Sequence, residues 1–271
     1  MGAFVARIKA ELQLQRADFD DFNKGEWITV FGSSSNRICM KNPILYHIYE
    51  ILSALFLTGL WIWSYADGCG VTWFAFLTHW SLTLQTVYSW FDFFTTFMAN
   101  GMSSGRFERV ESIPLYAQVT WFLFGLMVPT TFLVFVLYFA LLVDWNDPPT
   151  AVLSYLTHGA NFVVMMADTI LSNKPYYLLH GMYFFLFAAV YAVFTYIYYL
   201  LDGTNCEGDP YIYSVLNWGD NFASARRLSG IILVVVAPVI NFLFWIVISF
   251  WFPGLRPKPG AQEAPAADAN V

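Results

Sequence analysis

Residues 151–171 read AVLSYLTHGANFVVMMADTIL, and this stretch decides the class of fold. It is long and apolar enough to cross the hydrocarbon core of a bilayer, which takes about 20 residues of α-helix. It also contains His158, Asn161 and Asp168, whose polar groups lipid does not satisfy. The stretch therefore predicts a membrane-spanning helix with a polar face turned toward other helices.

The rest of the chain has the composition of an integral membrane protein. Of its 271 residues, 58% are hydrophobic and only 12% are charged, whereas soluble domains carry about 25% charged residues. Apolar runs long enough to span a bilayer lie at residues 44–65, 71–97, 116–143, 151–171, 176–201 and 228–252, separated by charged or turn-forming clusters. We expect an all-α integral membrane protein built as a six-transmembrane helix bundle.

The positions of lysine and arginine predict the orientation, because basic residues accumulate in cytoplasmic loops. With six spans, Arg226 and Arg227 fall on one side and every other basic residue falls on the other. Both termini are therefore expected in the cytoplasm. The chain then divides into a cytoplasmic N-terminal segment at 1–43, a transmembrane domain at 44–252, and a disordered cytoplasmic tail at 253–271 that is rich in Pro, Ala and Gly. The plasma membrane and the endoplasmic reticulum remain equal alternatives for its location.

Depth along the predicted helices brings one polar pair together near the outer face. Thr78 lies about seven residues into the second span and His158 about seven residues into the fourth, so both are about 10 Å below the boundary. A Thr hydroxyl beside a neutral imidazole supplies a nucleophile and its general base. Asn161 shares the helical face of His158, where it would orient the imidazole or bind an oxyanion. The alternative is structural: a Thr hydroxyl bonded to its own helix, and a His that holds helices together.

Two further pairs have structural interpretations. Asp168 ends the fourth span and His180 begins the fifth, so they are expected to pair across the short turn between them. Cys69 and Cys206 fall in two loops on the predicted outer, oxidising side, where they would form a disulfide or remain two thiols.

The sequence contains none of the motifs that indicate a bound metal or cofactor. There is no His-Glu-x-x-His helix, no Cys pair with metal spacing and no phosphate-binding Gly loop. No metal and no cofactor are therefore expected, and we expect no nucleic-acid partner. The oligomeric state is left open.

Three short segments resemble the rolling stone family of multipass membrane proteins, which is named for a protein implicated in myoblast fusion. They are His-Gly-x-Asn at residues 158–161, Pro-x-x-x-x-His at 175–180, and YIYSVLNW at 211–218. More distantly, the six-span pattern is similar to the androgen-induced-gene group, intramembrane hydrolases that act on fatty acid esters of hydroxy fatty acids. That resemblance implies a Thr nucleophile at Thr78 and a His base at His158. Ser214 stands where both groups tend to have Pro.

These observations favour a hydrolase of lipid (fatty acid) esters inside the membrane, with membrane lipids as partners and an acyl chain as the bound ligand. The aromatic segment at 211–218 is expected to cap its cavity. A non-catalytic protein of cell adhesion, cell fusion or signalling is the main alternative, and a lipid or small-solute transporter is the second. Thr78 and His158 are the residues on which these hypotheses differ.

Overall fold

A computed structural model of the protein describes residues 8–9, 11–12, 19, 25–34, 43–146 and 151–251. Over these residues the chain is helical and forms no strand. The long segments are α3 (Pro43–Ala66), α4 (Leu77–Ser103), α5 (Leu115–Leu137) extended by η3 (Tyr138–Leu142), α6 (Val152–Tyr155) continued through η4 (Leu156–Ala160) into α7 (Asn161–Leu171), α8 (Gly181–Leu200), and α9 (Phe222–Ile231) continued through η7 (Ile232–Val236) into α10 (Ala237–Trp251). The expected all-α class is confirmed, while the tail at 253–271 lies outside the described residues.

Four helical segments are long and apolar enough to cross a membrane. They are Ile44–Ala66, Leu115–Leu142, Leu178–Leu200 and Phe222–Ser249. The two remaining long segments, α4 and α6–α7, coincide with the other predicted spans but are interrupted by polar residues. The chain is thus a membrane protein with several apolar helices, and the count of six spans stays a prediction, as does the cytoplasmic location of both termini.

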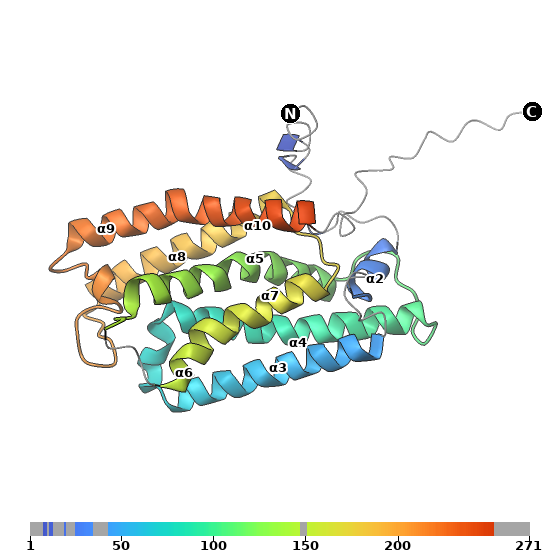
Figure 1. Cartoon of the computed structure of the whole chain (residues 1–271), viewed down its shortest axis with the longest axis horizontal. Coiled ribbons are helices and arrows are strands. Elements are labelled where there is room, and N and C mark those ends of the chain that lie inside the picture. Colours follow the sequence, from blue (N-terminus) through green and yellow to red (C-terminus); the bar gives the residue numbers. More distant parts are fainter. Residues whose placement is uncertain are drawn as a thin grey trace, which may run out of the picture.

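Successive long helices run in opposite directions along one axis (Figure 1). The start of α3, the end of α10 and the short helix α2 (Glu26–Phe31) lie at one end, which we call the terminal end. The connections at residues 67–76 and 201–221 lie at the opposite end, which we call the loop end. The bundle therefore has two opposite ends, the terminal end and the loop end, along one axis.

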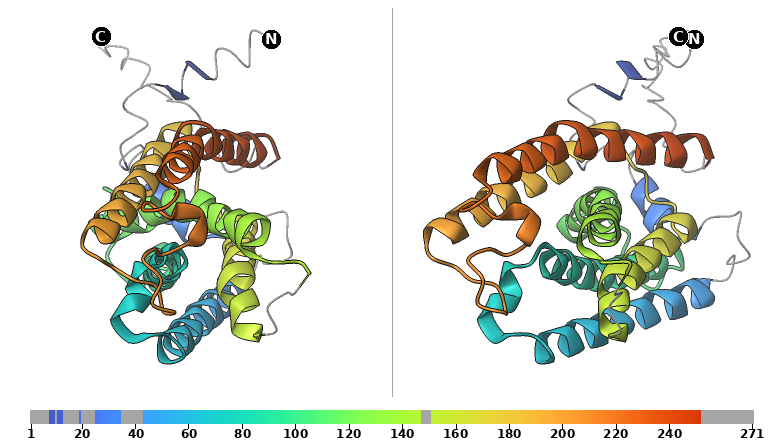
Figure 2. Two further views of the ribbon diagram at one scale, coloured as in Figure 1. Left: turned by 90° about the vertical axis from the view of Figure 1, so that its left-hand side faces the viewer. Right: turned by 60° about the vertical axis from the view of Figure 1, so that its left-hand side comes forward.

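Helix α5 occupies the centre of the bundle. It contacts α4, α7, α8 and α10, and the end-on view in Figure 2 shows these helices arranged around it. Of its most apolar stretch, 61% is buried inside the structure, against 22–33% for the other three apolar segments. The outer helices consequently leave most of their apolar surface for lipid, whereas α5 packs on protein.

Helix α4 turns its polar residues inward. Thr78, Ser81, Gln85, Ser89, Asp92, Thr95 and Thr96 are all buried on it. Their spacing of three to four residues places them on one face of a helix. Gln85 donates from Nε2 to the Asn161 carbonyl at 2.9 Å, and the hydroxyls of Thr95 and Thr120 lie 2.8 Å apart. These bonds tie α4 to its neighbours where lipid offers no partner.

Asn241 fastens α10 to the turn before α8. It accepts the Tyr176 hydroxyl proton at 2.6 Å and donates from Nδ2 to the Leu178 carbonyl at 3.0 Å. Gly181 makes room for this side chain, because a Cβ at position 181 would overlap the Asn241 amide. The contact of α8 with α10 thus depends on a residue without a side chain.

Replacing Gly181 with Ala is expected to destabilise the bundle by about 1–3 kcal/mol, since Asn241 must move and give up two buried hydrogen bonds. Gly230→Ala on α9 is the matched control, because a Cβ there meets no atom within 4 Å. The thermal unfolding midpoint of both variants in the same detergent checks the expectation. Equal midpoints for the two variants would contradict it.

Candidate functional site

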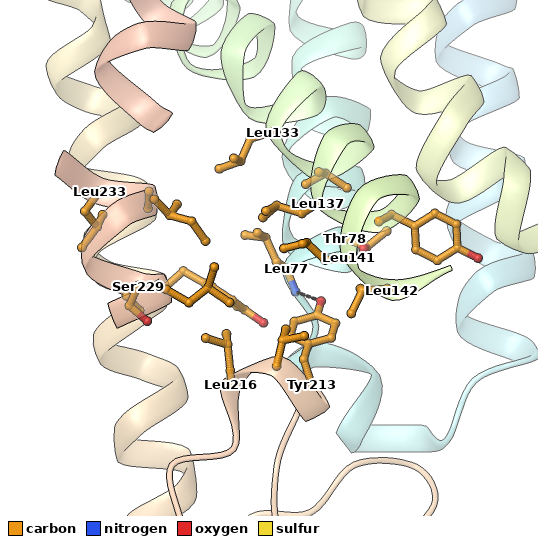
Figure 3. Close-up of a pocket in the computed structure, with 18 of the residues that line it drawn as sticks. Leu77, Thr78, Leu133, Leu137, Leu141, Leu142, Tyr213, Leu216, Ser229 and Leu233 are labelled. Carbon is orange, nitrogen blue, oxygen red and sulfur yellow. Dashed lines mark hydrogen bonds between the residues drawn. The ribbon is translucent and has the colours of Figure 1, made fainter. Parts of the chain in front are cut away.

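A cavity of about 80 Å³ opens at the loop end of the bundle, between α5, α8 and α9. A single water needs about 10–15 Å³ measured in this way, so the cavity admits a much larger group. Its walls are predominantly leucine, including Leu133, Leu137, Leu216 and Leu233 (Figure 3). Such walls favour an apolar ligand over a polar one.

The polar groups of the cavity gather near the start of α4. Thr78 lies in the wall and is 5% exposed. The Tyr213 hydroxyl accepts the backbone N–H of Leu77 at 3.0 Å (Figure 3). Tyr191 lines the same region and donates to the Ala75 carbonyl at 2.9 Å. An apolar ligand would therefore meet these hydroxyl groups near α4 and the Ser229 hydroxyl in the wall formed by α9.

The aromatic segment at 211–218 lies against this cavity. Tyr213, Val215 and Leu216 contribute to its wall, and the Trp218 indole donates to the Thr195 hydroxyl at 3.2 Å, which anchors the segment on α8. The segment thus lies against the cavity, and its expected role as a cap stays a prediction.

His158 lies beside the cavity wall, one side chain away from the open space. Its ring stacks on Tyr138, with centroids 3.5 Å apart, and Tyr138 lines the cavity. Nδ1 lies 2.7 Å from the Ser154 carbonyl oxygen. A carbonyl only accepts, so Nδ1 carries a proton, and in the neutral ring Nε2 holds the lone pair.

Thr78 and His158 are neighbours of one cavity without touching each other. In the described part of the chain, no hydrogen bond joins them, and His158 Nδ1 bonds the Ser154 carbonyl of its own helical segment. A nucleophile and its base need a hydrogen bond of about 2.6–3.2 Å, often longer in a ligand-free state. The structure thus places the two residues on opposite sides of the cavity wall, on α4 and η4, and does not bring them into contact through a hydrogen bond.

Three π-helical turns surround this site. Tyr138 and Leu141 of η3 line the cavity, as do Ile232 and Leu233 of η7, while η4 contains His158. A π-helical turn widens the helix by one residue and frequently occurs at functional sites. These turns have no periodicity in the sequence from which they are predictable: η3 and η7 lie within continuous apolar runs, and η4 is the mixed segment LTHGA.

Asn161 points to α4 and not to His158. Its side chain is fully buried, with Nδ2 3.4 Å from the Ser81 hydroxyl, and its backbone carbonyl accepts from Gln85. The expected role in orienting His158 has no support in these contacts. Asn161 joins α7 to α4 in the layer directly below the cavity.

Asp168 has different partners from the one expected. Its Oδ2 accepts the Tyr88 hydroxyl proton at 2.5 Å and lies 3.3 Å from Lys174 Nζ. His180 is fully buried among aromatic rings, including those of Phe19 at 4.3 Å and Trp121 at 5.2 Å between centroids. The backbone is extended at Ser172, after α7 ends, and Lys174 lies in this connection before α8 begins.

Lys174 forms the ion pair that sequence reasoning missed. Its Nζ lies 2.7 Å from both carboxylate oxygens of Asp92, and both residues are buried. The sequence places Lys174 in a short turn, where a lysine is expected to reach the membrane surface. The unpaired carboxylate of Asp92 inside a span was the available signal, since such a charge requires a buried partner.

The structure joins Cys69 and Cys206 by a disulfide, with Cα atoms 5.5 Å apart. The bond links the connection before α4 to the loop before α9, both at the loop end. It therefore links the connection that precedes Thr78 to the loop that contains Tyr213. Among the described residues, no group of three His, Cys, Asp or Glu side chains is arranged to hold a metal ion.

Comparison with known proteins agrees with the resemblance seen in the short motifs. The family pattern described as Protein rolling stone matches residues 3–250. The chain is 26% identical to Protein rolling stone of Drosophila melanogaster over 85% of this chain and 90% of that protein. No solved structure matches the chain. Because the match extends over nearly its whole length, the protein belongs to the rolling stone family of membrane proteins.

Proposed function

We propose that this protein binds a lipid acyl chain in the cavity at the loop end and hydrolyses a lipid ester there. The single observation that supports binding is a largely apolar cavity in a membrane protein, with hydroxyl groups at one end. An acyl chain matches the leucine-rich walls, and its ester or carboxyl group matches Thr78 and Tyr213. Lipid ligands reach such a cavity from the membrane itself.

The ester chemistry rests on three groups. The Thr78 hydroxyl is the proposed nucleophile, and its proton passes to Nε2 of His158 as the Thr oxygen attacks the ester carbonyl. The Tyr213 hydroxyl accepts the Leu77 N–H and keeps its own proton, which it can donate to the developing oxyanion. His158 then returns the proton to the leaving alkoxide, and water attacking the acyl-Thr ester completes hydrolysis. These reaction steps use no metal and no cofactor.

The reaction requires His158 to approach Thr78 when a ligand is bound. The His158 ring stacks on Tyr138 of the π-helical turn η3, so a small displacement of that turn moves the imidazole relative to the cavity. The hydrogen bond from Nδ1 to Ser154 already selects the tautomer with Nε2 as the base. These contacts support a general base whose tautomer is set before the substrate binds.

The proposed membrane orientation has six spans, with the terminal end in the cytoplasm. A disulfide at the loop end favours an oxidising compartment on that side. Burial of Lys174 removes one residue from the count of cytoplasmic basic residues, but Arg106 and Arg109 still lie in the connection at the terminal end. The cavity would then open toward the outer leaflet.

Epitope tags at the two ends are expected to be protected from protease in sealed vesicles with the cytoplasmic face inside, and a tag inserted at Gly208 is expected to be cleaved. Gly208 suits insertion because it lies in the loop at 201–221, and a Cβ at this position would meet no atom within 4 Å. Cleavage of a terminal tag in intact vesicles would contradict the six-span orientation.

Ala192→Trp is expected to reduce crosslinking of a photoreactive fatty acid to the purified protein by about tenfold, because the indole fills part of the cavity that Ala192 lines. The matched control is Val193→Trp, one residue along α8 and 58% exposed on the outer surface. Crosslink yield, measured by mass spectrometry at equal protein, checks the expectation. Equal loss in both variants would argue against binding in the cavity.

Thr78→Ala is expected to abolish labelling of the purified protein by a fluorophosphonate probe, since the probe reacts with an activated hydroxyl. Thr78→Ser should retain labelling, and His158→Gln should reduce it at least about 100-fold through loss of the base. Thr83→Ala on the same helix is the control, because the Thr83 hydroxyl bonds the His79 carbonyl away from the cavity. A folded wild-type protein that is never labelled would reject hydrolysis and favour a non-catalytic role in adhesion, fusion or signalling.

A further inference from the structure

His47 and Glu50 form a pair near the start of α3, at the terminal end of the bundle. His47 Nδ1 lies 3.1 Å from Glu50 Oε2. The Glu50 side chain is 1% exposed, whereas that of His47 is 22% exposed. The pair therefore connects a buried carboxyl group to the surface of the protein. It lies at the opposite end of the bundle from the cavity proposed to bind a lipid.

Glu50 is the buried carboxyl group with the least compensation. Lys174 is the ammonium of this region, and its Nζ lies 2.7 Å from both oxygens of Asp92 and 3.3 Å from Asp168. In the described part of the chain, no hydrogen bond or ion pair joins Lys174 to Glu50. The other ionisable groups that face Glu50 from α3, α4 and α7 are acids: Tyr46, Tyr49, Tyr88, Asp92 and Asp168. Three carboxylates around one ammonium leave an excess of negative charge, which is costly in a buried place.

The hydrogen bond from Asn100 indicates that His47 is neutral. Asn100 Nδ2, near the end of α4, lies 3.0 Å from His47 Nε2. An amide nitrogen only donates, so Nε2 holds the lone pair of the ring and Nδ1 carries the proton. Nδ1 then donates to Glu50 Oε2. The His47 ring thus supplies a hydrogen bond to Glu50 and no positive charge.

The second oxygen of Glu50 is an independent indication of its protonation state. Glu50 Oε1 is buried and has no hydrogen-bond partner among the described residues. A buried ionised carboxylate needs acceptor bonds at both oxygens, and leaving one unmade costs more for a charged group than for a neutral one. A carboxyl group with its proton on Oε1, and with Oε2 accepting from His47, therefore suits this environment better than a carboxylate.

We propose that Glu50 is a proton-binding site, occupied at neutral pH, and that His47 exchanges this proton with water at the terminal end. In the exchange, hydronium gives a proton to Nε2, the Nδ1–H bond breaks, and that proton passes to the Glu50 carboxylate. Asn100 accommodates the new Nε2–H by rotating its amide, which offers an acceptor oxygen as well as a donor. Chains of His and acidic side chains inside membrane proteins serve as proton relays. The inference is independent of lipid binding and hydrolysis.

Infrared spectroscopy of the purified full-length protein at neutral pH tests the proton on Glu50. The expected result is a C=O band of a protonated carboxylic acid, which shifts in D₂O and is lost in Glu50→Gln. Glu108→Gln is the matched control and should leave the band unchanged, because Glu108 is exposed in the connection between α4 and α5. Glu50→Asp serves if Glu50→Gln does not fold, and it should move the band. Wild-type protein without this band would overturn the proposal, as would an unchanged band in either folded Glu50 variant.

His47→Gln tests the exchange route. After transfer into D₂O, the C=O band should shift at least about tenfold more slowly in this variant than in the wild type, because an amide does not relay a proton from water. His79→Gln is the matched control, since His79 lies at the loop end of α4. Asn100→Leu should slow the shift several-fold, because it removes the acceptor for the relayed proton, and it serves if His47→Gln does not fold. Exchange at the wild-type rate in either folded variant would overturn the relay.

Discussion

The buried polar face of α4 is the constraint on which the rest of the structure depends. A helix inside a membrane-spanning bundle must direct such groups toward protein, because hydrocarbon offers no hydrogen-bond partner. The partners come from several elements: Asn161 from α7, Thr120 from α5, the Phe31 carbonyl from α2, and Lys174 from the turn after α7. The positions of α2, α5 and α7 around α4 follow from these bonds as much as from apolar packing.

The same constraint divides the surroundings of α4 into two layers. At the loop end, the α4 face begins with Thr78, and the surrounding helices leave an apolar cavity bounded by π-helical turns. Toward the terminal end it reaches Asp92, where Lys174 and the carboxylates of Asp92 and Asp168 gather. Ser81, Gln85 and Asn161 lie between the two layers. The apolar cavity and the buried ion pair therefore lie at different levels of one helix.

The π-helical turns explain how a rigid bundle retains space for a ligand. Each turn interrupts a regular helix at the level of the large cavity, which displaces the helix face by one residue. Central α5 is otherwise packed on all sides, so an opening at its end needs a local departure from α-helical geometry. Tyr138 lies in the π-helical turn η3, and its ring connects the cavity wall to His158. The disulfide from Cys69 to Cys206 keeps the loop with Tyr213 in place over the opening.

The sequence by itself determined the helical class, the positions of the long helices and the family, because apolar runs of membrane length and short motifs are local properties. It also predicted that Thr78 and the 211–218 segment lie beside one cavity, which Thr78 and Tyr213 both line, while their side of the membrane stays a prediction. Only the tertiary structure decided the partners of the buried charges. Lys174 pairs with Asp92, more than 80 residues away, and Asp168 faces Tyr88 and Lys174 in place of His180. Depth gives one coordinate of a side chain, whereas pairing also requires the rotation of each helix, and packing around α5 sets that rotation.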